Sequence, residues 1–154
     1  MLKTGQNAPD FVLPDADMEQ VELASYRGNN NVLLFFYPKD DTPGCTLEAT
    51  DFSDHEDEFA RQGVVLLGVS RDDCLCHASF RDKHGISARL LSDEGGQVCR
   101  KYGVWQTKEV DGVKKQGILR STFVIDKQGV VRHALYGVNA KGHALEMLRL
   151  VKEL

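Results

Sequence analysis

The chain has 154 residues, of which 42% are hydrophobic and 27% are charged, and its net charge is −4. These values predict one globular domain spanning residues 1–154, and the acidic balance predicts no nucleic-acid or anionic membrane partner. No stretch approaches the roughly 18 apolar residues of a membrane-spanning helix. The first residues also lack the apolar core of a secretory signal, so we expect a cytoplasmic protein.

The first half of the chain predicts a strand–helix–strand unit. A short strand is expected at residues 20–23, and the apolar runs 31–37 (NVLLFFY) and 64–70 (VVLLGVS) are typical of strands buried on both faces. Between these runs, one helical stripe ending near Gly63 carries Cys45, Ala49, Phe52, Glu56 and Phe59. This order predicts parallel strands joined by a right-handed crossover.

The second half predicts the remaining layers. A helix is expected over residues 72–85, a short edge strand over 90–93 and a brief helix within 94–103. Residues 121–137 contain two β-type runs joined at Lys-Gln-Gly, which predicts a hairpin, and residues 140–154 have helical periodicity. Together the elements predict an α/β fold of the thioredoxin-like kind, with a mixed central sheet flanked by helices on both faces.

Cys45 follows the first buried strand at the predicted start of a helix. Thr42 suits the N-cap and Pro43 the first helical position, so Cys45 would lie in the first turn, where the helix dipole favours a thiolate. That dipole supplies about 1 kcal/mol, whereas making a thiol mostly ionised at neutral pH takes roughly 2.7 kcal/mol. Asp40 and Asp41 would oppose ionisation if they were close. The local pattern therefore predicts either an ordinary buried cysteine or a reactive one that needs a cation from elsewhere.

A resemblance to a known family favours the reactive cysteine over the ordinary buried one. Pro38, Thr42 and Cys45 reproduce the active-site pattern of the peroxiredoxins, and the string FFYPKDDTPGCTLEA resembles the bacterioferritin-comigratory, or Q-type, subfamily. The similarity continues through GVSRDD, KHG, LLSDE, KYGVW and LRSTFVIDKQG. It implies a thiol peroxidase that reduces hydrogen peroxide and organic hydroperoxides, is recycled by thioredoxin or a glutaredoxin-like thiol donor, needs no metal, flavin or haem, and is a monomer.

The resemblance also implies roles for individual residues. Cys45 would attack the peroxide and become a sulfenic acid, and Arg120 would supply the missing cation. Thr42 and backbone N–H groups near Gly44 would help to hold the peroxide. Pro38 would shield the thiolate from water, and Glu48 would orient Arg120 unless it is merely an exposed helical glutamate.

The cysteine that would resolve the sulfenic acid is left open. Thr50 and Arg81 occupy the two positions where related proteins carry it. We rank Cys74 first, because it shares a helical face with Arg81, then Cys76, then Cys99, which lies beside two cations. A one-cysteine mechanism with an external thiol is a close alternative.

Three other functions compete with this reading. A peroxide sensor that passes oxidation to a partner protein would use the same cysteine. A thioredoxin-type reductase is disfavoured, since Glu48 stands where a CxxC motif needs its second cysteine. Residues 74–77 (CLCH) could bind a metal, but no second paired ligand set accompanies them, so we expect no metal site.

Overall fold

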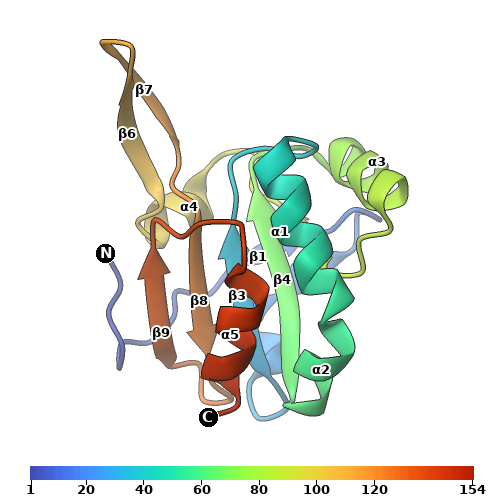
Figure 1. Ribbon diagram of the computed structural model, residues 1–154. Coiled ribbons are helices and arrows are strands. Elements are labelled where there is room, and N and C mark those ends of the chain that lie inside the picture. Colours follow the sequence, from blue (N-terminus) through green and yellow to red (C-terminus); the bar gives the residue numbers. More distant parts are fainter.

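The computed structural model describes residues 1–154, apart from the side chain of Val110. Figure 1 shows a central sheet with helices packed in front of it and a two-stranded arm projecting from one end. The elements in chain order are β1 (Val12–Pro14), β2 (Gln20–Glu22), the 3-10 helix η1 (Leu23–Tyr26), β3 (Asn31–Phe36), α1 (Pro43–Asp54), α2 (Glu56–Arg61), β4 (Val64–Ser70), α3 (Cys74–His84), β5 (Arg89–Ser92), α4 (Gln97–Lys101), β6 (Trp105–Val110), β7 (Val113–Ile118), β8 (Ser121–Ile125), β9 (Val131–Tyr136) and α5 (His143–Val151).

The central sheet has five strands in the order β5-β4-β3-β8-β9. Strand β3 pairs in parallel with β4, and β4 pairs in parallel with β5, as expected for strands joined by helical crossovers. On its other side β3 pairs antiparallel with β8, which forms a hairpin with β9. The predicted mixed sheet and the predicted edge position of residues 90–93 are therefore confirmed.

Two hydrophobic clusters fill the two faces of this sheet, because successive strand side chains point to opposite sides. Leu33 and Phe35 point into the cluster beneath α1, α2 and α5, where they meet Phe52 and Met147. On the other face, residues of β3 meet the N-terminal segment and α4. One sheet is thus shared by both clusters, and the single domain over residues 1–154 stays a prediction.

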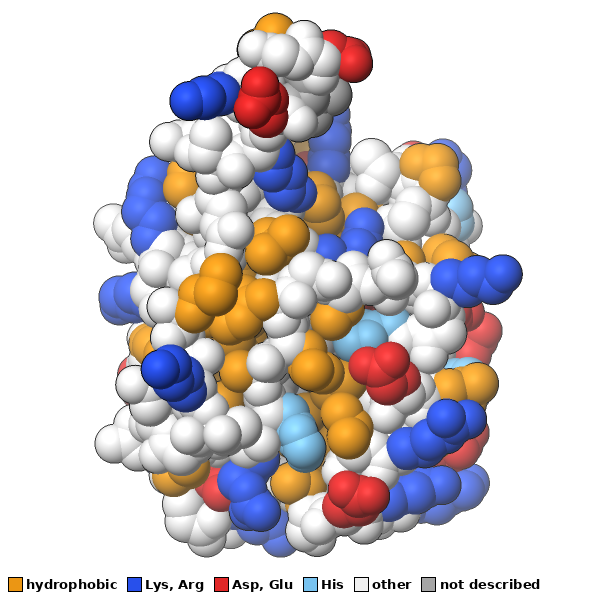
Figure 2. Space-filling model, turned by 60° about the vertical axis from the view of Figure 1, so that its left-hand side comes forward, with side chains coloured by type: hydrophobic (Ala, Val, Ile, Leu, Met, Phe, Trp, Pro, Cys, Tyr) orange, Lys and Arg blue, Asp and Glu red, His pale blue; other side chains and the backbone are white. Residues whose placement is uncertain are grey.

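Besides β1 and η1, which the sequence did not predict, the structure departs from the predicted elements at α1 and at the arm. The predicted long helix is interrupted at His55, whose φ of −107° and ψ of 9° are not helical, so α1 and α2 are separate. Strands β6 and β7 form an antiparallel hairpin that the sequence did not predict. Four of the six residues of β7 are exposed, from Val113 to Gln116, so the strand lacks the apolar alternation that marks a half-buried strand. Figure 2 shows both basic and acidic side chains on this projecting arm.

A search of the described residues for a helix long and apolar enough to cross a bilayer found none.

Candidate active site

Cys45 lies in the first turn of α1, as predicted. Thr42 is the N-cap residue with extended φ and ψ, and Pro43 is the first helical residue. The Thr42 hydroxyl does not cap the helix; it donates instead to the carbonyl of Lys39 at 2.8 Å. The N–H groups of Gly44 and Cys45 are too early in the helix for intrahelical partners, so they add a positive potential beside the thiol.

Arg120 reaches Cys45 from the loop just before β8. Its Nη2 donates to Cys45 Sγ at 3.2 Å and its Nη1 donates to Glu48 Oε1 at 2.9 Å. The Cys45 residue is only 2% exposed, and the Arg120 side chain is 16% exposed. The fork of the guanidinium thus joins the thiol and the carboxyl, in the way that suits arginine and not lysine.

Gly44 makes this approach possible. A Cβ atom built on Gly44 would lie 3.2 Å from Arg120 Nη2, closer than such contacts normally allow. The glycine therefore matters here for the space it leaves to the guanidinium.

Glu48 is a buried carboxyl one turn beyond Cys45. Its residue is 1% exposed, and its second oxygen, Oε2, has no hydrogen-bond partner among the described residues. Burial raises the pKa of Glu48 to about 7, and the charge and hydrogen bond of Arg120 offset only part of that effect. Near neutral pH, Glu48 is therefore a mixture of the protonated acid and the carboxylate.

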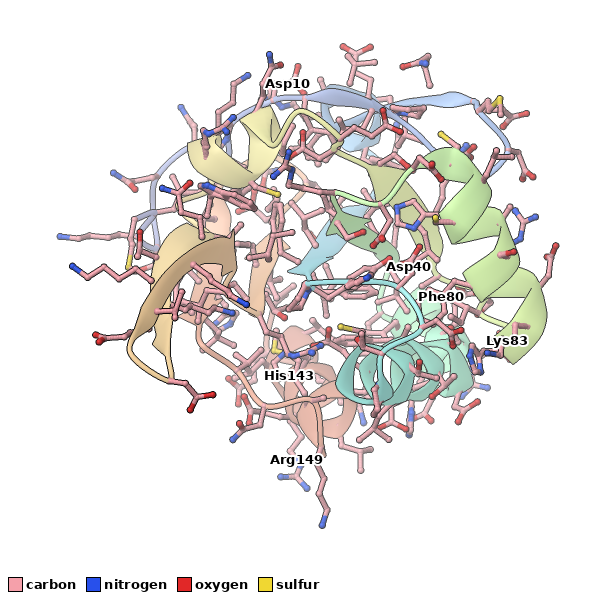
Figure 3. The ribbon with its side chains drawn as sticks, turned by 90° about the horizontal axis from the view of Figure 1, so that it is seen from above. Asp10, Asp40, Phe80, Lys83, His143 and Arg149 are labelled. Carbon is pink, nitrogen blue, oxygen red and sulfur yellow. The ribbon has the colours of Figure 1, made fainter. Side chains whose placement is uncertain are left out.

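The two aspartates of the loop before α1 are bound to helix α3. Asp40 accepts from Tyr37 at 2.7 Å and pairs with His77 at 2.7 Å, while Asp41 pairs with Lys83 at 2.7 Å and contacts His84 at 2.8 Å. Figure 3 shows Asp40 between this loop and α3, with Phe80 and Lys83 on the neighbouring helix. Both carboxylates, which the sequence analysis expected to oppose a thiolate at Cys45 if they were close, are thus paired with side chains of α3.

Two further buried residues near the site were missed by the sequence analysis. Thr122 Oγ1 lies 2.7 Å from His143 Nε2, and the ring of His143 packs edge-on against Phe52. Burial lowers the pKa of His143; Glu146 opposes that shift and Arg120 adds to it. Neither residue has a sequence motif of its own, since the pair forms only when α5 packs beside β8.

Pro38 is exposed, so its predicted shielding of the thiolate stays a prediction.

The three candidate resolving cysteines lie in different surroundings. Cys74 is half-buried and lines a cavity of about 310 Å³ with Leu13, Pro14 and Ser92. Cys76 is exposed and lines a cavity of about 330 Å³ with Lys39, Asp40 and Asp41 from the loop before α1. All four cysteines are free thiols in this structure.

The surroundings also bear on thiol reactivity. Cys99 is fully buried, and burial together with a hydrogen bond and charge from Asp93 raises the pKa of its thiol. Burial and Asp93 thus outweigh the opposing charge of Arg71 at this thiol. The pKa of Cys76 is raised chiefly by its hydrogen bond with Asp73.

His77, the last residue of CLCH, uses both of its ring nitrogens within the protein. Nδ1 faces Asp40 and Nε2 lies 2.9 Å from the carbonyl of Leu91. Over the described residues, no group of three or more His, Cys, Asp or Glu side chains has the arrangement of a metal site.

Comparison with known proteins assigns the chain to a family. The model of the AhpC/TSA family matches residues 4–134, a range that includes Cys45, Glu48 and Arg120. The chain therefore belongs to the AhpC/TSA family, and it is a thiol peroxidase of the oxidoreductase class.

Similarity to individual proteins indicates the subfamily within this family. The putative peroxiredoxin bcp of Coxiella burnetii is 43% identical over 147 residues, covering 96% of this chain and 97% of that protein. The peroxiredoxin Bcp of Escherichia coli K12 is 41% identical over 152 residues, covering 99% and 97%. A solved structure of the bacterioferritin comigratory protein of Xanthomonas campestris, studied for its alkyl peroxide reduction activity, matches with a TM-score of 0.88 at 36% identity, covering 93% of this chain and 90% of that one. Within the family the chain thus groups with the bacterioferritin-comigratory, or Q-type, peroxiredoxins.

Proposed function

We propose that Cys45 is the peroxidatic residue and that it reduces peroxides through a sulfenic acid. The observation that carries the proposal is the 3.2 Å contact between Arg120 Nη2 and Cys45 Sγ in the first turn of α1. A guanidinium at this distance stabilises a thiolate, which is the nucleophilic form of cysteine.

The thiolate attacks one peroxide oxygen. An S–O bond forms as the O–O bond breaks, so the sulfur is oxidised to a sulfenic acid and the other oxygen leaves as hydroxide or alkoxide, which takes up a proton. Arg120 and the N–H groups of Gly44 and Cys45 stabilise the charge that moves onto the departing oxygen. Hydrogen peroxide and organic hydroperoxides are the proposed substrates, and the alkyl peroxide reduction described for the Xanthomonas relative supports the second class.

A thiol donor then returns the oxidised Cys45 to the thiol. We propose thioredoxin or a glutaredoxin-like protein as the physiological donor. Four free cysteines suit a reducing compartment such as the cytoplasm. We also propose that the protein acts as a monomer.

For the resolving thiol, the placement of the side chains favours Cys76 over Cys74. Cys76 shares a cavity with the loop that leads to Cys45, whereas the cavity beside Cys74 is lined by β1 and the segment after β5. The Cys76 thiolate would attack the sulfenic sulfur, forming the S–S bond as the S–O bond breaks; the oxygen leaves as hydroxide, which takes up a proton to become water. Peptide mapping of the peroxide-treated protein tests this: a Cys45–Cys76 bridge supports it, whereas a Cys45–Cys74 bridge or no bridge contradicts it.

The activity is tested by following peroxide consumption with a thioredoxin and thioredoxin reductase system. We expect catalytic turnover in the wild-type protein and none in Cys45→Ser. A single stoichiometric oxidation that then stalls, with each of several thiol donors, would support the peroxide sensor instead.

A further inference from the structure

The loop before α1 is held in place mainly by a different helix. Residues 38–42 join β3 to α1, yet their two acidic side chains, Asp40 and Asp41, both bind α3. The backbone N–H of Asp40 also donates to Asp72 Oδ2 at 2.8 Å, at the end of the segment that leads into α3. The position of this loop is therefore set by a segment some 30 to 40 residues further along the chain.

The contact between His77 and Asp40 is the buried part of this attachment. His77 is 0% exposed and Asp40 is 9% exposed. The Leu91 carbonyl can only accept a hydrogen bond, so His77 Nε2 must carry a proton. The 2.7 Å separation between Nδ1 and Asp40 Oδ2 requires a second proton, located between those two atoms.

Loss of this contact would be costly for the loop. A buried polar atom left without its partner costs about 1–3 kcal/mol, and more when it is charged. The second oxygen of Asp40 already accepts from Tyr37, so the carboxyl has a fixed orientation. Asp41 adds strain at the same place, because its φ of 60° lies in the left-handed region.

Two hydrogen bonds connect the loop around Asp40 to the first turn of α1, which carries Cys45. Lys39, the neighbour of Asp40, accepts the hydroxyl hydrogen bond of Thr42, and the Thr42 carbonyl accepts the first helical hydrogen bond from Thr46 at 2.8 Å. Cys45 lies between these residues. A shift of Asp40 would therefore displace the helix start that presents Cys45 to the peroxide.

We propose that His77 is a positioning residue for peroxide reduction, because its contact with Asp40 fixes the loop that places Cys45. The inference rests on the proposed role of Cys45. It also gives α3 a function: separating the first turn of α3 from the loop would release Cys45 from its peroxide-reducing position.

A matched pair of variants separates the two contacts of His77. In His77→Asn the amide nitrogen occupies the place of Nδ1 and can still donate to Asp40. In His77→Gln it occupies the place of Nε2, so it keeps the Leu91 contact and loses Asp40. Lys83→Met serves as a control, because the Lys83 side chain is 62% exposed and exposed ion pairs contribute little.

Two rates are measured on each reduced protein: single-turnover reaction with hydrogen peroxide, and alkylation of Cys45 by chloroacetamide. Misplacement of reacting groups by about 1 Å costs about 100-fold, so we expect His77→Gln to react with peroxide roughly 10-fold to 100-fold more slowly. Its alkylation should become faster, since a displaced loop uncovers a thiol that is 2% exposed. His77→Asn and Lys83→Met should stay within about threefold of wild type, as expected for contacts that are kept or exposed.

Three outcomes would overturn the proposal. They are a His77→Gln peroxide rate within about threefold of wild type, equal losses in both rates, and a loss in His77→Asn as large as in His77→Gln. Circular dichroism checks folding; if His77→Gln does not fold, Asp40→Ala, which removes the partner of Nδ1, is measured in its place, with the same expectation and the same criteria. A wild-type protein that fails to react with peroxide would contradict the proposed function itself, which separates the two failures.

Discussion

The ionisation of Glu48 gives a direct test of the electrostatics of the site. Burial raises its pKa from the ordinary value of 4.5 to about 7, against the opposing charge of Arg120. Between these pH values the unfolded chain releases a proton that the folded protein keeps. The free energy of unfolding must therefore fall as the pH rises through this range.

The magnitude follows from the two pKa values. A rise from 4.5 to about 7 corresponds to about 3 kcal/mol, at roughly 1.4 kcal/mol per pH unit. This contribution is fully present below pH 4.5 and is lost as the pH passes 7. In Glu48→Gln the side chain has nearly the same volume and carries no titrating proton, so that variant should lack this pH dependence.

Urea unfolding of the reduced proteins at intervals from about pH 4 to pH 8 measures the effect. We expect wild type to lose about 3 kcal/mol relative to Glu48→Gln over this range. Glu146→Gln removes a carboxylate whose side chain is 60% exposed and serves as the control. A difference between wild type and Glu48→Gln that is flat, or that grows in favour of wild type at high pH, would refute the reasoning.

Three further substitutions test individual contacts. Arg120→Lys keeps a charge but cannot span Cys45 and Glu48 together, so we expect the single-turnover peroxide rate to fall about 100-fold. Thr42→Val removes the hydroxyl that donates to Lys39 and should lower that rate about tenfold by loosening the helix start, whereas Thr42→Ser should keep it. Phe52→Ala empties a fully buried site and should cost about 3–5 kcal/mol of unfolding free energy in urea, with Phe52→Leu costing less.

Each of these predictions has a contrary result. An Arg120→Lys protein with the wild-type rate would show that charge alone suffices. Equal loss in Thr42→Ser and Thr42→Val would assign the effect to something other than the hydroxyl. A Phe52→Ala protein less than about 1 kcal/mol below wild type would mean that the core collapses around the missing ring.

Local sequence determined the elements that carry strong periodicity. The apolar runs of β3 and β4 predicted buried parallel strands, and Thr42 and Pro43 predicted the start of α1. These signals are readable because each depends on residues a few positions apart. The arm formed by β6 and β7 was not predicted because Val113 to Gln116 of β7 are all exposed, so the strand lacks the apolar alternation of a half-buried strand.

The site was only partly determined by sequence. Cys45 could be located from its own surroundings, because a helix start is a local structure. Arg120 could be assigned only through family resemblance, since its arrival beside Cys45 depends on the antiparallel pairing of β8 with β3.

The tertiary structure alone decided the charges around the thiol. Sequence placed Asp40 and Asp41 close to Cys45 in the chain, where they would oppose a thiolate. Packing of α3 against the loop gives both carboxylates other partners, of which His77 is buried. Burial of Glu48 likewise raises its pKa to about 7, above the value of an exposed helical glutamate. Ionisation depends on desolvation and on charges brought together from distant segments, and neither can be predicted from the residues that are adjacent in the chain.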